Sequence, residues 1–164
     1  TSLAYRCAQA GYQLLADDVV FLLRSDSRTQ LRGNPSRLQF SVSARQLFPE
    51  LQSFPVGVRR DGDEFLAVSV EETLAAGAVT RAQPGAVVFL ERGGRPALER
   101  VPPGEAHQLL FSVLRLDDAG TMAAHSATLQ RLVQEGAYRM RYSTLEEGLE
   151  QLSLLPCRQD AGAT

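Results

Sequence analysis

The sequence predicts an α/β domain with a mixed, twisted sheet and flanking helices. Short strand-like runs separated by turn residues fill most of the chain up to Val101, and helical spacing dominates after Pro103. The chain has 164 residues, of which 44% are hydrophobic, so it can bury a core. We expect one domain over residues 1–156 and a disordered tail over 157–164, because no long linker separates two regions.

The first elements lead to a pair of acidic residues. Residues 1–10 carry apolar side chains at helical spacing, and Gly11 has the usual left-handed position beyond a helix. Residues 12–16 and 19–23 predict two strands joined through Asp17-Asp18.

A polar turn over residues 25–28 precedes a further β-rich stretch. Residues 30–32 and 37–40 predict strands, with Gly33-Asn34-Pro35 between them. Ser43 is a typical N-cap, and the apolar positions within 43–51 share one helical face, so a short helix is expected there.

The middle of the chain alternates between loops and strands. A loop is expected over residues 54–62, and Arg59-Arg60 with Asp61 and Asp63 indicates a solvated turn. A strand over 64–70 and a helical turn over 71–76 follow.

The strongest hairpin signal lies in residues 85–101. Strand-like residues 85–91 and 97–101 flank Gly93-Gly94, a dipeptide typical of hairpin turns. The remaining elements are predicted to be helices over 104–114 and 117–135, a strand over 138–142, and a last helix from the Ser143-Thr144 cap to Leu155.

Composition excludes several classes of function. The 17 basic residues are all arginine, 19 residues are acidic, and the formal net charge is -2, so neither a nucleic-acid nor an anionic-membrane partner is expected. No apolar stretch approaches membrane-spanning length, and there is no signal-peptide pattern. Cys7 and Cys157 are single and distant, which favours two reduced thiols in a cytoplasmic protein.

Asp17-Asp18 is the strongest candidate for chemistry. Two acids at a strand end point to opposite sides, so one can hold Mg²⁺ while the other accepts a proton from a hydroxyl. The alternative is an acid pair that only forms a turn or a cap. Thr1 lies sixteen residues upstream and opens a helix, which is how P-loop phosphotransferases space a magnesium-binding hydroxyl from a strand-end acid.

These residues resemble a known family. Thr1-Ser2-Leu3-Ala4, the helix ending at Gly11-Tyr12 and the run Leu14–Val20 are similar to the segment after the P-loop in the HPr kinase/phosphorylase family and its phosphoenolpyruvate-carboxykinase-like relatives. Residues 125–155 resemble, more weakly, the ending of HPr-kinase-related proteins. The resemblance implies a phosphoenolpyruvate-carboxykinase-like fold and transfer of phosphate from ATP, with Mg²⁺, to a Ser or small-molecule hydroxyl.

The resemblance also implies roles for individual residues. Thr1 would bind Mg²⁺ and, with Ser2, the nucleotide; Asp17 would be the catalytic acid/base, and Asp18 a metal or water ligand, although the division between the two acids stays open. The chain contains no lysine, so we expect it to be truncated just after the P-loop lysine and inactive in isolation. The Arg-His-Leu-Leu-Glu-Ile-Arg-Gly signature of true HPr kinase/phosphorylases has no match, so the acceptor is left as a hydroxyl-bearing protein or small molecule.

Arginine and histidine residues elsewhere in the chain are further candidates. Arg32 and Arg37 flank Gly33-Asn34-Pro35, where an arginine could clamp a γ-phosphate or simply be exposed to solvent. His107 and His125 lack a second ligand at helical spacing and are expected to be structural.

Two rival functions remain. One is a non-catalytic binding or scaffold module with a degenerate kinase fold. The other, a phosphoenolpyruvate-carboxykinase-like decarboxylase, is disfavoured because its manganese site needs a lysine. A homo-oligomer could form through residues 87–90 or the apolar stripe over 129–133, although such stripes are more often core.

Overall fold

The computed structural model describes residues 1–23, 29–74, 77–113 and 119–156. The turn predicted over 25–28, the tail predicted over 157–164 and Cys157 lie outside the described residues. The chain divides into two compact units, one with residues 1–22 and 31–82 and the other with residues 23–30 and 83–164. Each unit is described by itself below, and the single domain predicted over 1–156 stays a prediction.

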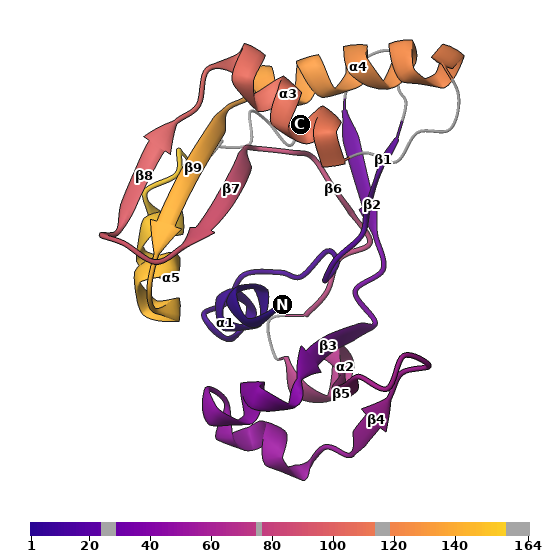
Figure 1. Ribbon diagram of the computed structural model, residues 1–164, viewed down its shortest axis with the longest axis vertical. Helices are drawn as coiled ribbons and strands as arrows, with labels where there is room; N and C mark the ends of the chain where they lie inside the picture. Colours follow the sequence, from indigo (N-terminus) through magenta and orange to yellow (C-terminus); the bar gives the residue numbers. More distant parts are fainter. Residues whose placement is uncertain (24–28, 75–76, 114–118, 157–164) are drawn as a thin grey trace, which may run out of the picture. The chain divides into compact units, whose positions relative to one another are not determined.

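The N-terminal unit combines short helices with two small sheets (Figure 1). Its elements, two of which cross the boundary between the units, are α1 (Ser2–Gln9), β1 (Val20–Leu23), β2 (Gln30–Gly33), β3 (Arg37–Ser41), the 3-10 helices η1 (Val42–Gln46) and η2 (Pro49–Ser53), β4 (Val56–Val58), β5 (Glu64–Ser69), α2 (Val70–Thr73) and β6 (Arg81–Ala82). Strand order is β1-β2-β6 in one sheet and β3-β5-β4 in the other.

The core of this unit forms where β3 and β5 pair in antiparallel register. Leu38 lies opposite Val68 and Phe40 opposite Leu66, and their side chains are buried on one face of the sheet. The ring of Tyr5, from α1, packs edge-on against Phe40 at 5.3 Å between centroids, so the first helix is fixed to this core.

The predicted first helix is confirmed, but the strand after it is not. Gly11 follows α1 with φ of +99°, as expected beyond a helix C-terminus. Residues 12–16 do not form a strand: only Leu14 makes a single parallel bridge, to Ala78. The apolar run suggested a buried strand, but Tyr12 N donates back to Cys7 O at 3.0 Å, at the end of α1. Leu14 alone bonds the segment 77–79, accepting from Val79 N at 2.9 Å and donating to Gly77 O at 3.4 Å.

Two other local expectations need correction. The helix expected over 43–51 is two 3-10 helices, because Pro49 has no N–H to continue the first and instead begins the second. The loop expected over 54–62 contains β4, whose Gly57 lies opposite Phe65. A Cβ at Gly57 would lie 2.8 Å from the Phe65 ring, so the glycine makes room for the aromatic side chain.

The C-terminal unit places one sheet against helices. Its elements are β7 (Val87–Arg92), β8 (Ala97–Arg100), α3 (Pro103–Val113), α4 (Ala119–Gln134), β9 (Ala137–Tyr142) and α5 (Leu145–Ser153). Its core contains Val101, Ala106, Val133 and Ala137, with Leu110 packed against them. The predicted cap of the last helix is confirmed, because Thr144 and Glu147 form a complete capping box.

The predicted hairpin is wrong in its pairing. β9 lies between β7 and β8, parallel to β7 and antiparallel to β8 (Figure 1). The turn itself is where it was expected: Gly93 and Gly94 have φ of +100° and +78°, and Gly93 N donates to Tyr142 O at 2.8 Å. The turn depends only on adjacent residues. The pairing of β7 and β8 depends instead on β9, which follows the turn by more than forty residues in the sequence.

The fold is therefore mixed α/β with flanking helices, as predicted, but within the described residues its strands form three small sheets instead of one. Only β7-β9-β8 is mixed among the pairings described. No described helix has the combination of length and apolar character required to cross a bilayer.

Candidate functional site

Thr1 and Asp17 are brought together in the N-terminal unit. Thr1 precedes α1 as its N-cap residue, yet its side chain makes no capping hydrogen bond, so the hydroxyl is not engaged by the helix. The main-chain nitrogen of Thr1 lies 3.8 Å from Oδ1 of Asp17. The spacing seen in the sequence thus corresponds to proximity in space.

The two oxygens of Asp17 have different surroundings. Oδ2 accepts a hydrogen bond from the main-chain N–H of Gln39 at 2.9 Å. Oδ1 is buried and accepts no hydrogen bond from the described residues. Only 10% of the Asp17 side chain is exposed. Its charged neighbour in the structure is the Thr1 nitrogen, which forms an ion pair with it at 3.8 Å. A buried carboxylate oxygen without a hydrogen bond is costly, and a bound cation is another partner that would satisfy it.

Main-chain packing holds Asp17 in this position. Residues 14–17 pass beside Gly33, where a Cβ would overlap the carbonyl oxygen of Leu15, so only glycine permits this approach. Gly33 N donates to Thr80 O at 3.1 Å, which fixes the other side of the same strand end. β3 is an edge strand, and its Gln39 N–H is therefore free to reach Asp17 instead of β5.

The other predicted site residues are placed differently. Asp18 is exposed, and no hydrogen bond or ion pair with the described residues holds its carboxylate. Ser2 is half-buried in the first turn of α1. The structure brings Thr1 to Asp17, whereas the sequence had grouped Thr1 with Asp18 as metal ligands.

Arg32 is not brought to the acid pair. It precedes Gly33 in β2, and because neighbouring strand residues face opposite ways, its side chain points away from the face that packs on Leu15. Arg32 pairs across β2 and β6 with Arg81, and both side chains are exposed. Arg37, the other arginine of the predicted clamp, is exposed at the start of β3, and the clamp stays a prediction.

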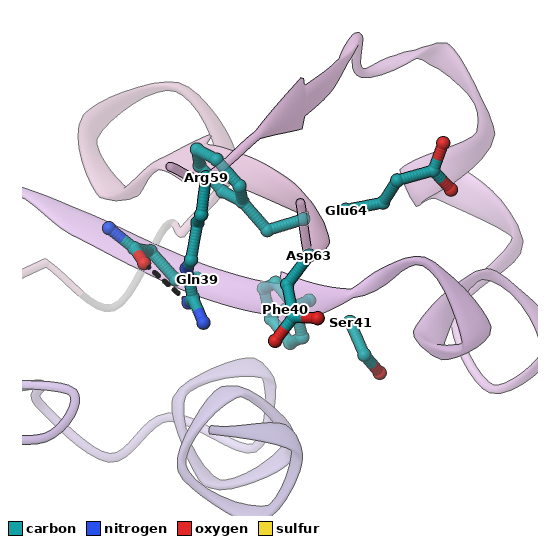
Figure 2. A pocket seen from close by; sticks show the side chains of 7 residues that line it. Gln39, Phe40, Ser41, Arg59, Asp63 and Glu64 are labelled. Carbon is teal, nitrogen blue, oxygen red and sulfur yellow. Dashed lines mark hydrogen bonds between the residues drawn. The ribbon is translucent and has the colours of Figure 1, made fainter. Parts of the chain in front are cut away.

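Sequence reasoning missed a hollow on the β3-β5-β4 sheet (Figure 2). It has a volume of about 320 Å³ and is lined by Gln39, Phe40, Ser41, Arg59, Asp63, Glu64 and Phe65. We call it the Arg59 hollow. The charged stretch around Arg59 had indicated only a solvated turn, and the signal that could have found the hollow is the alternation that puts Gln39 and Ser41 on one strand face.

The donor set at Asp17 fits a magnesium ion that is shared with a phosphate. Among the residues that the structure describes, no group of three or more His, Cys, Asp or Glu could hold a metal by itself. Mg²⁺ is commonly bound by one or two carboxylates together with waters and substrate phosphates, so Asp17 is the described residue that could hold it here.

His107 has a partner in the C-terminal unit. Its Nε2 lies 3.0 Å from Ser126 Oγ, and its ring stacks on Phe111. The contact with Ser126 links α3 to α4, whereas Phe111 belongs to α3 itself; both are in keeping with the structural role expected for this histidine.

Comparison with models of protein families, with curated proteins and with solved structures finds no match to this chain.

Proposed function

We propose that the N-terminal unit carries the acidic half of a magnesium-dependent phosphotransferase site, of the kind found in HPr-kinase-related proteins with a phosphoenolpyruvate-carboxykinase-like fold. The observation that supports it most is the approach of Thr1 to Asp17, whose Oδ1 is buried without a hydrogen bond from the described residues. The approach of the Thr1 main chain to Asp17, together with the spacing of the two residues in the sequence, supports a hydroxyl and an acid on either side of a nucleotide-bound cation.

The contacts favour a specific division between the two acids. Oδ2 of Asp17 is held by Gln39 and Oδ1 is enclosed beside Thr1, which suits a group that faces a cation. Asp18 is exposed and free to meet an acceptor, which suits a general base. This assignment reverses the roles that the family resemblance implied for Asp17 and Asp18.

In the proposed reaction, the hydroxyl oxygen of the acceptor forms a bond to the γ-phosphorus of ATP. The bond from that phosphorus to the β–γ bridging oxygen breaks, ADP leaves, and the hydroxyl proton passes to Asp18. Mg²⁺, held by Asp17 and the Thr1 hydroxyl, supplies neutralisation of the phosphate charge when bound. The proposal requires a Gly-rich loop with a lysine immediately before Thr1, because the chain has no lysine of its own.

The test is MgATP binding by the protein as its gene encodes it, measured by calorimetry with and without Mg²⁺. We expect binding that depends on Mg²⁺ in the unmodified protein. Asp17→Asn should weaken it at least about tenfold, since charge-assisted contacts to the cation are lost. Asparagine retains a carbonyl oxygen for Gln39 N–H, so the fold should be kept.

Glu71→Gln is the matched control, because Glu71 is an exposed acid of the same unit, in α2. It should leave MgATP binding unchanged. A sequence before Thr1 without the glycines and lysine, or no MgATP binding by the encoded protein, would contradict the proposal and favour the non-catalytic binding module.

A further inference from the structure

The Arg59 hollow is built on one face of the β3-β5-β4 sheet. Ser41 lies opposite Phe65 in the antiparallel register, and Gln39 lies two residues earlier on the same strand face. Arg59 follows β4 and returns over this face, with its guanidinium carbon 5.3 Å from the centre of the Phe65 ring. The cation thus rests on an aromatic surface.

The guanidinium of Arg59 is fixed by a neutral partner. Its NH2 donates to Oε1 of Gln39 at 2.8 Å (Figure 2). Arginine has five N–H donors, so several remain to bind an anion. Because Gln39 carries no charge, the full positive charge of Arg59 is available to a ligand.

Two carboxylates line the same hollow without neutralising Arg59. The turn that carries them is tightly closed, since Arg59 N donates to Asp63 O at 2.8 Å and Asp63 N to Asp61 Oδ1 at 3.2 Å. Even so, neither Asp63 nor Glu64 forms an ion pair with Arg59 in the described structure. Figure 2 shows the Asp63 carboxylate on the same side of the sheet as the arginine, whereas the Glu64 side chain extends away.

A hollow with separate positive and negative groups matches a ligand that carries both charges. A volume of about 320 Å³ is at the small end of ligand sites, so the ligand has few atoms beyond its charged groups. We propose that the Arg59 hollow binds a small zwitterion with a hydroxyl group, its anionic end on Arg59 and its ammonium on Asp63.

The position of the hollow connects it to the proposed reaction. Gln39, which lines the hollow, bonds Asp17 through its main-chain N–H and Arg59 through its side chain, so one residue links the hollow to Asp17. This zwitterion is then the phosphate acceptor, a step that rests on the proposed function. Binding of the zwitterion needs neither ATP nor Mg²⁺, so the two proposals can fail separately.

The test uses L-serine as the probe, with ¹H–¹⁵N spectra of the chain followed during titration. We expect saturable shifts at Gln39, Arg59 and Asp63. Ethanolamine, which lacks the carboxylate, and glycolate, which lacks the ammonium, should each bind at least about tenfold more weakly, because each loses one charge-assisted contact.

Variants separate the hollow from general charge effects. Arg59→Gln and Asp63→Asn should each weaken L-serine binding about ten- to a hundredfold. Arg60→Gln, at the neighbouring exposed arginine outside the hollow, should have no effect. An absence of saturable shifts with L-serine, equal binding of all three probes, or equal losses at positions 59 and 60 would overturn the proposal. Saturable binding without phosphorylation of serine by the encoded protein would leave the site standing and overturn its role as the phosphate-acceptor site.

Discussion

Asp17 and Tyr5 illustrate how single side chains combine structural and chemical roles in the N-terminal unit. Asp17 satisfies the free edge of β3 through Gln39 and keeps one buried oxygen beside Thr1. Tyr5 packs against the aromatic core and donates to Glu50 Oε1 at 3.2 Å. The sequence identified Asp17 as a candidate site residue. It could not identify the hydrogen bond from Gln39, because that contact joins residues 22 apart in the chain.

A pH dependence follows at the residue scale. Burial, and then the charge of Glu50, raise the pKa of Tyr5 above its ordinary value of 10.0. The folded state thus holds this proton more tightly than the unfolded state, and stability should fall as pH rises above about 10 through the raised pKa.

The measurement is urea unfolding of the unmodified chain and of Tyr5→Phe at pH 8 and at pH 11. We expect the unmodified chain to lose more stability between the two values than the variant, which has no proton to release. An equal loss in both proteins would show that Tyr5 does not titrate across this range.

At the scale of elements, local signals located the turns and caps but not the pairing of strands. Gly93-Gly94 and the Thr144 capping box lie where the sequence placed them, because each depends on residues that are adjacent in the chain. The predicted pairing of the hairpin was wrong because β9 lies between β7 and β8. The predicted strand over residues 12–16 was wrong because this segment packs against distant residues, at positions 33 and 77–79.

Gly33 provides the test of this element packing. Gly33→Ala should destabilise the N-terminal unit by about 1–3 kcal/mol or more, since the added Cβ overlaps the Leu15 carbonyl and the main chain must move. Gly85→Ala is the control, because a Cβ there meets nothing within 4 Å.

Thermal or urea unfolding measures both variants. A Gly33→Ala variant as stable as Gly85→Ala would mean that the segment leading to Asp17 is not held against β2 as described.

At the scale of the whole molecule, composition and periodicity were sufficient to predict a mixed α/β protein, and the structure agrees. They could not predict three small sheets, since the grouping of strands depends on contacts between distant segments. The candidate site also has a part that the sequence could predict and a part that it could not. Thr1 and Asp17 were predicted from their spacing in the sequence. The Arg59 hollow could be found only once the register of β3, β4 and β5 was known.

The central claim is that Asp17 and Asp18 serve one phosphoryl-transfer site. The most direct measurement is ADP release from MgATP by the encoded protein, with L-serine as acceptor, for the unmodified chain, Asp17→Asn and Asp18→Asn. Each substitution should lower kcat at least about a hundredfold, and Asp17→Asn should also raise the Mg²⁺ concentration required. Turnover within about twofold of normal in Asp17→Asn would contradict the claim.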